Sequence, residues 1–160
     1  MILALDCASV TGWANVGKDG RLIESGVQDF RKRRGESNGI MFLRFRKWLT
    51  GLVEALPEKP SVLVYEQAHF RGGAATEICV GLQTRVQEVA AAFGIESAPV
   101  TTETLKLFAC GHGRVGKDRM IEAAETILRK HGHARPPLDD NEADAIHAAM
   151  WGYDQYGWTG

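Results

Sequence analysis

The sequence predicts an α/β domain with a mixed central sheet flanked by helices, and three observations predict it. First, short apolar runs end in an acid at residues 2–6 and again at residues 61–66. Second, two alternating runs flank a turn at residues 18–20. Third, apolar residues elsewhere recur at three- and four-residue steps, as in amphipathic helices. With 160 residues, 44% of them hydrophobic, the chain is expected to form one domain over residues 1–160.

The opening part of the chain is predicted to form three antiparallel strands, and the later strands are expected to be parallel. Asp19-Gly20 between two alternating runs is a strong hairpin signal. A helix is predicted over residues 39–56, and Pro57 ends its pattern. The remaining predicted elements are a strand at 61–66, a helix near 74–93, a strand at 95–100, and helices near 102–109, 117–131 and 140–151. Gly81 costs its helix about 1 kcal/mol relative to Ala, which predicts close packing against another helix, of this chain or of a partner subunit.

Composition points to a reducing compartment and away from membranes. Cys7, Cys79 and Cys110 are odd in number and lack a CxxC spacing, which argues against disulfides and structural zinc. The first apolar run meets an acid too early for a signal peptide, and no stretch approaches the roughly 20 apolar residues that cross a bilayer. We therefore expect a cytoplasmic protein, in a bacterium or a phage-infected cell.

The formal net charge of −1 by itself favours an ordinary mixed-charge surface over a nucleic-acid binder. The charges are nevertheless clustered. One basic run spans residues 31–34 and includes Arg33 and Arg34; a second group contains Lys106, Arg114 and Lys117. A basic surface that follows phosphates, next to an acidic site, would also leave the total charge near zero.

Three acids fall at the ends of predicted elements or among apolar neighbours. Asp6 and Glu66 each end an apolar strand, and Asp144 lies within an alanine-rich helix. Each acid alone is most simply a strand end or a helix surface, but a buried acid costs free energy unless it is paired or binds a metal. Together they predict a site for hard cations with oxygen ligands. Phosphodiester hydrolysis uses two divalent ions about 3.5–4 Å apart, which predicts Asp6 as the bridging ligand.

The fourth ligand position is open. Asp140 lies about 40° from Asp144 around the helix, and Asn141 lies about 60° away on the other side, so either can reach the site. Asp139 begins a capping-box pattern, which assigns it a structural role. His147 shares the face of Asp140 and Asp144, and a packing role is favoured over that of a general base.

Four segments resemble RuvC-type Holliday junction resolvases, and together they span almost the whole chain in the order of that family. They are Ile2–Ala8 with Thr11–Ala14, Val64-Tyr65-Glu66-Gln67, Leu105-Lys106 with its spacing to Gly111 and Lys117, and Glu142–Ala145. The short length and divergent loops resemble a compact, phage-type member. The resemblance implies the ribonuclease H-like fold and a homodimer that nicks a four-way DNA junction symmetrically, with two Mg²⁺ or Mn²⁺ ions per active site.

The resemblance also implies roles for individual residues. Asp6, Glu66 and Asp144 match the acids of the family directly. Asn141 stands where many relatives carry Asp or His, so Asp140 is expected to substitute from one position earlier. Lys106 and Lys117 match basic residues that contact the scissile or neighbouring phosphates, and the helix near 74–93 matches the dimerisation helix. The remaining expected DNA contacts are Arg114, Arg33 and Arg34, together with His69 and Phe70, which occupy the place of an aromatic wedge.

The sequence also allows two other functional interpretations. Residues 111–117 nearly form a phosphate-binding loop, but Asp118 replaces the Ser or Thr that binds magnesium, so no nucleotide cofactor is expected. The fold is also compatible with a non-catalytic nucleic-acid binder, or with a nuclease for other branched DNA or RNA–DNA hybrids. The intact acidic set argues against a pure binder, because carboxylates without cations repel phosphate.

Overall fold

The structure is a computed structural model that describes residues 1–69 and 72–157 of the chain. Its elements are β1 (Ile2–Asp6), β2 (Val10–Val16), β3 (Leu22–Asp29), α1 (Asn38–Ala55), β4 (Val62–Glu66), α2 (Ala74–Phe93), β5 (Glu96–Val100), α3 (Thr102–Cys110), α4 (Lys117–Lys130) and α5 (Asp140–Tyr156). In the described ranges, no helix combines the length and apolar character that a membrane crossing requires.

The five strands form one mixed sheet in the order β3-β2-β1-β4-β5. The first three strands pair antiparallel, whereas β4 and β5 run parallel to β1, as the sequence predicts. The hairpin between β2 and β3 closes where Gly17 donates its amide to the carbonyl of Arg21, and Gly20 adopts a positive φ of 78°. Strand β1 is therefore central, and Asp6 lies at its carboxyl end.

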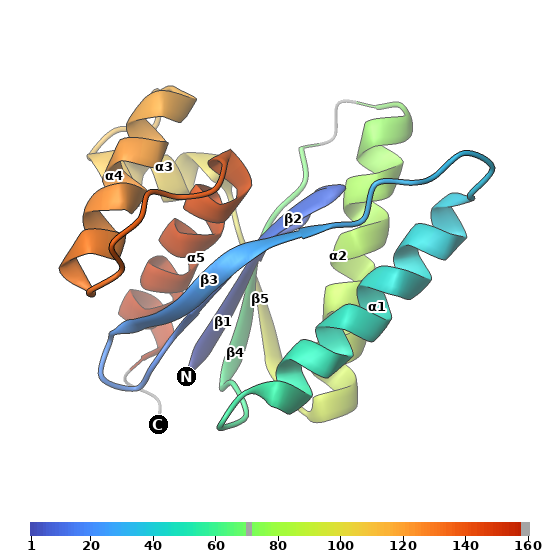
Figure 1. Cartoon of the computed structure of the whole chain (residues 1–160), viewed down its shortest axis with the longest axis horizontal. Coiled ribbons are helices and arrows are strands. Elements are labelled where there is room, and N and C mark those ends of the chain that lie inside the picture. The colour runs from blue at the N-terminus through green and yellow to red at the C-terminus, as the bar shows by residue number, and fades with distance from the viewer. Residues whose placement is uncertain (70–71, 158–160) are drawn as a thin grey trace.

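Helices cover both faces of the sheet, so that two cores form (Figure 1). Alternation along β1 divides its side chains between the cores: Ile2 and Ala4 pack with α3, α4 and α5, whereas Leu3 and Leu5 pack with α1 and α2. Figure 1 shows the carboxyl ends of β1 and β4 at the same end of the molecule as the beginnings of α3 and α5. The strand ends and helix starts that carry the predicted acids thus meet.

Two glycines let α5 lie directly on the sheet. A Cβ added at Gly12 would lie 1.9 Å from the backbone oxygen of Asn141, and Gly12 is paired with Asp6 across β1 and β2. A Cβ at Gly152 would lie 2.7 Å from Val64 Cγ2. Helix α5 continues through Gly152 to Tyr156, beyond the predicted end at residue 151. The close approach at Gly12 brings the turn that carries Asp144 towards Asp6.

We expect Gly12→Ala to destabilise the protein by about 2 kcal/mol or more, because its methyl group would push the start of α5 away from β2. Gly51→Ala is the matched control, since a Cβ at Gly51 in α1 meets nothing within 4 Å. This control is expected to gain about 0.5–1 kcal/mol from the better helix propensity of Ala. Urea unfolding measures both changes; equal stabilities of the two variants would contradict the packing described here.

An ion pair between buried Glu142 and partly exposed Arg135 fixes the start of α5. Glu142 is fully buried and accepts hydrogen bonds from Arg135 at 2.6 and 3.0 Å, from Ser25 Oγ at 2.7 Å and from the Leu138 amide at 2.6 Å. Burial raises the pKa of Glu142, but these hydrogen bonds outweigh it and hold the pKa below its usual value. Asp139 Oδ1 accepts the amide of Glu142 at 2.9 Å, which confirms its predicted capping role. The reciprocal capping-box bond is replaced, because Glu142 bonds the Leu138 amide instead.

Gly81 packs against a helix of its own chain. A Cβ at Gly81 would lie 2.1 Å from Cζ of Phe42, which belongs to α1. The predicted close approach between helices is therefore confirmed, and the contact is within the chain. A partner subunit is not needed to account for this glycine.

The two edges of the sheet differ in their backbone chemistry. Strand β5 forms one edge and contains Pro99, which pairs in register with Tyr65 of β4. Proline lacks an amide hydrogen, so within sheets it is confined mainly to edge strands. The opposite edge is β3, with Ile23 and Glu24 exposed to solvent.

Candidate functional site

The carboxyl groups of Asp6, Glu66 and Asp144 meet at one end of the sheet. One carboxylate oxygen from each of the three lies within 4.8 Å of the others. Asp6 ends β1, Glu66 ends the neighbouring parallel strand β4, and Asp144 is in the second turn of α5. The predicted convergence of acids that are remote in sequence is present in the structure.

These carboxyl groups hinder one another's ionisation. Burial, followed by the charges of Glu66 and Asp144, raises the pKa of Asp6 well above its usual value. Burial and the charges of Glu66 and Asp140 raise the pKa of Asp144 to about 7. Burial also raises the pKa of Glu66, although a hydrogen bond from Thr102 and the nearby charges of His69 and Lys106 oppose it. Three half-buried carboxyl groups that repel one another are the donor set that a hard divalent cation favours, so the residues fit such an ion.

Asp140 lies beside this group and pairs with a lysine. Its Oδ2 is 2.6 Å from Lys117 Nζ, at the start of α4. Asp140 is outside the three-residue cluster, but its charge acts on both Asp6 and Asp144. Asn141 donates from Nδ2 to Asp139 Oδ2 at 3.4 Å, and its backbone faces Gly12. Which of Asp140 and Asn141 supplies a fourth ligand stays a prediction.

Thr102 is a site residue that the sequence analysis does not identify. Its hydroxyl donates to Glu66 Oε1, and His69 Nε2 lies 2.8 Å from the same hydroxyl oxygen. Lys106, one turn further along α3, is close enough for its charge to act on Glu66 and Asp144. The sequence does contain one signal for Thr102. Two threonines stand at the predicted start of the helix, and only one is needed as its cap, so the hydroxyl of the other is available for a different contact.

The predicted DNA contacts lie on several segments. Lys106 is in α3, Arg114 is exposed in the following loop, and Lys117 begins α4. Arg33 and Arg34 are exposed between β3 and α1. Figure 1 shows that this last loop and the start of α2 extend at the end of the molecule where β1 and β4 finish. Phe70 was predicted as part of the wedge and lies outside the described residues.

His147 has a packing role, as the sequence analysis favours. Its side chain is fully buried, and Nε2 lies 2.8 Å from the carbonyl oxygen of Met120 in α4. Burial lowers the pKa of His147 below its usual value. The histidine therefore joins α5 to α4 beneath the surface.

Comparison with known proteins gives one consistent result. No protein-family profile matches the chain. The crossover junction endodeoxyribonuclease RuvC of Synechococcus sp. strain WH7803 is 25% identical over 139 residues, covering 87% of this chain and 86% of the relative. The protein of the same name from Parasynechococcus marenigrum strain WH8102 is 26% identical over 135 residues, covering 84% and 83%.

Solved structures confirm the predicted ribonuclease H-like fold. Thermus thermophilus RuvC superposes with a TM-score of 0.76 at 18% identity, covering 98% of this chain and 96% of that structure. Its complex with a Holliday junction substrate superposes with a TM-score of 0.75 at 17% identity, covering 93% and 90%. The likeness extends over nearly the full length of both chains.

Proposed function

We propose, from the premise that the chain is a RuvC-type member of the ribonuclease H-like superfamily, that it is an endonuclease that resolves four-way DNA junctions. The observation that carries this proposal is the meeting of Asp6, Glu66 and Asp144 within 4.8 Å. Relatives that cover more than four-fifths of the chain are named crossover junction endodeoxyribonucleases, and one similar structure holds a Holliday junction. Residues 1–160 are proposed to act as one nuclease domain.

In the proposed site, Asp6, Glu66 and Asp144 would hold two divalent cations, Mg²⁺ or Mn²⁺. When bound, the cations activate the attacking water and stabilise charge on the leaving oxygen of the phosphodiester. The protein contributes rigid ligand positions, because two of the acids end neighbouring strands of the central sheet. Lys106 and Lys117 are proposed to hold the phosphates beside the site and to offset their charge.

Asp140 is the fourth ligand that we favour over Asn141. Its charge already contributes to the raised pKa values of Asp6 and Asp144. Its ion pair with Lys117 is exposed, so little free energy opposes its exchange for a cation contact. Lys117 is then released to contact the scissile phosphate.

A cleavage assay with three labelled substrates tests the proposed function. We expect the purified protein to cut a four-way junction in Mg²⁺, with paired nicks on opposed strands, and to leave a linear duplex and an RNA–DNA hybrid intact. EDTA should prevent the cutting. Cleavage of the hybrid alone would favour the alternative substrate, and junction binding without cleavage would support a non-catalytic binder.

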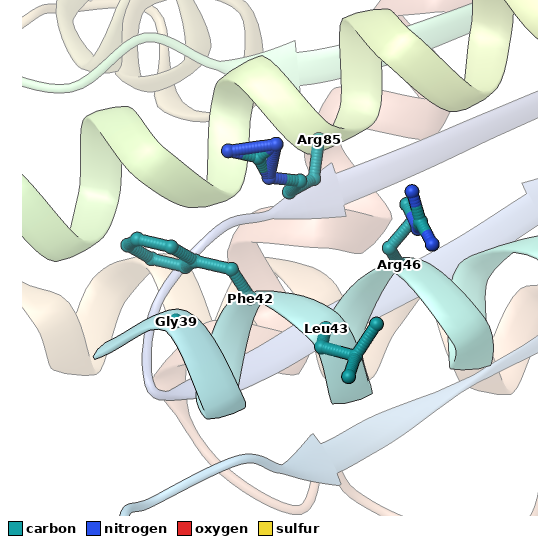
Figure 2. A pocket seen from close by; sticks show the side chains of 5 residues that line it. All are labelled: Gly39, Phe42, Leu43, Arg46 and Arg85. Carbon is teal, nitrogen blue, oxygen red and sulfur yellow. The ribbon is translucent and has the colours of Figure 1, made fainter. Parts of the chain in front are cut away.

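Symmetrical nicks require two sites, and a homodimer formed through the outer face of α1 and α2 would supply them. Ile40 and Leu43 on α1 are 43% and 44% exposed, and their spacing of three residues places them on the same face of the helix. Figure 2 shows Leu43 beside a pocket of about 240 Å³ that is lined by Gly39, Phe42, Leu43, Arg46 and Arg85. The Arg85 guanidinium lies 5.6 Å from the centre of the Phe42 ring. This apolar surface rimmed by arginine has the composition of a protein interface.

Leu43→Glu is expected to weaken the dimer about thirtyfold or more, because the substitution places a charge within a contact that excludes water. Leu107→Glu is the control, since Leu107 is an equally large, exposed residue on α3. Light scattering across a dilution series measures the effect. A Leu43→Glu dimer as tight as that of the control, or a wild-type protein that stays monomeric, would contradict this interface.

A further inference from the structure

We infer that Thr102 is a positioning residue that holds the carboxylate of Glu66 in its cation-binding orientation, and that His69 acts on Glu66 through it. The inference rests on the proposed function of the acidic site. It is carried by two hydrogen bonds, one from the Thr102 hydroxyl to Glu66 Oε1 and one of 2.8 Å between His69 Nε2 and the same hydroxyl. The two bonds join three segments of the chain: the end of β4, the segment that follows it, and the start of α3.

The Thr102 hydroxyl is not engaged by its own helix. Thr101 caps α3, because its side chain accepts the amide of Thr104 at 3.1 Å. Hydroxyls at a helix start usually serve such local bonds. The Thr102 hydroxyl instead reaches a carboxylate 36 positions earlier in the sequence. Its contact is therefore with the site and does not contribute to the helix cap.

The number of available protons sets the direction of this relay. An ionised carboxylate can only accept hydrogen bonds, and a threonine hydroxyl has one proton to donate. Thr102 donates that proton to Glu66, so its oxygen accepts from His69, and the proton must be on His69 Nε2. Successive hydrogen bonds of this kind strengthen one another.

Glu66 has more need of such support than the two aspartates. Its side chain has an additional rotatable bond, and the terminal torsion of a glutamate is broad without a partner. The Glu66 backbone is held by Gln83 Nε2, which donates to its carbonyl at 3.2 Å. The hydrogen bond from Thr102 to Oε1 restricts the rotation of the carboxylate about its terminal torsion. Hydrogen-bond partners of metal ligands typically contribute 10- to 100-fold in metal affinity or activity.

His69 connects this support to the substrate. It lies in the segment between β4 and α2, which the sequence analysis assigns to contact with the junction. DNA that contacts His69 would therefore act on a cation ligand through two hydrogen bonds. The orientation of Glu66 is in this way coupled to occupation of the DNA site.

Mn²⁺ binding, measured calorimetrically at pH 8 without DNA, tests the role of Thr102 independently of cleavage. Thr102→Val keeps the shape and removes the hydroxyl; we expect its affinity for Mn²⁺ to fall about tenfold. Thr102→Ser restores the hydroxyl and is expected to bind within about twofold of the wild type. Thr126→Val is the matched control, because the Thr126 hydroxyl bonds to the Glu122 carbonyl of its own helix. Melting in EDTA verifies that all variants are folded.

The contribution of His69 is tested by a double substitution. If His69 acts on Glu66 through the Thr102 hydroxyl, its effect should disappear when that hydroxyl is removed. His69→Ala should weaken Mn²⁺ binding in the wild-type background and have no further effect in Thr102→Val. Equal losses in both backgrounds would overturn the relay from His69.

The outcomes separate this inference from the proposed function. A Thr102→Val protein that binds Mn²⁺ within twofold of the wild type overturns the positioning role, even if the wild type cleaves junctions. A wild type that binds Mn²⁺ but cuts no junction overturns the proposed function. In that case, a tenfold loss in Thr102→Val still supports the positioning role.

Discussion

Asp6→Asn is expected to lower the rate of junction cleavage by roughly a thousandfold or more, while the metal-free protein becomes more stable at pH 8. Asp6 lies within 4.8 Å of both Glu66 and Asp144, and it is the residue proposed to serve both cations. Asparagine keeps its size but removes the charge, and a two-metal site needs that charge. The same change removes a buried charge and its repulsion by Glu66 and Asp144, the main causes that raise the pKa of Asp6.

The opposite signs of these two effects make the experiment specific. Cleavage is followed with a labelled four-way junction in Mg²⁺, and stability by thermal melting in EDTA. Junction binding should be unchanged or tighter, because a negative charge beside the phosphates has been removed. Asp154→Asn is the control, because Asp154 is an exposed acid on α5, and it should alter neither property. A lower melting temperature of Asp6→Asn would show that Asp6 has a structural role instead.

Without metal, Asp144 should make the protein less stable as the pH rises from about 4 to 7. Its pKa is raised to about 7 in the folded protein, above its usual value of 3.8, so the folded state holds a proton that the unfolded state has lost. Its stabilising contribution is complete below pH 4 and is lost as the pH passes 7. The expected loss between pH 5 and pH 8 is of the order of 1–3 kcal/mol.

Urea unfolding of wild type and Asp144→Asn at both pH values measures this contribution. The relevant quantity is the difference in the free energy of unfolding between the two proteins. The lowered pKa of His147 makes the fold more stable as the pH rises, and this contribution is common to both proteins. The wild type should lose stability relative to Asp144→Asn at pH 8, and Mn²⁺ should restore it in the wild type only. A difference that is independent of pH would contradict the electrostatic account of the site.

The elements and the three acids could be predicted because local patterns determine them. Asp6 and Glu66 each end an apolar run, and it is their occurrence together with Asp144 that indicates a site. The antiparallel pairing of β2 with β3 follows from the hairpin, and the parallel direction of β4 and β5 follows from the helices that connect them. The end of α5 differs from the predicted end, because a glycine usually weakens a helix. Gly152 is retained within α5 because its backbone contacts the sheet closely.

The hydrogen bonds that support the site could not be predicted in the same way. Thr102 and Glu66 are 36 positions apart, and no period or motif links a threonine to a distant carboxylate. Arg135 and Glu142 are close in sequence, but their contact with Ser25 depends on where β3 passes. Such contacts follow from the arrangement of elements in space, so they become visible only once the fold is known.

The proline at the edge of the sheet restricts how two copies of this protein can associate. A neighbouring strand that aligned with β5 would find no amide hydrogen at Pro99 and would lose a ladder bond there. Continuous intermolecular sheets, the usual route to fibres, are therefore disfavoured on that side. Association through side chains of helices, as proposed for α1 and α2, can instead be tuned by single substitutions without disturbing the backbone that carries the acids.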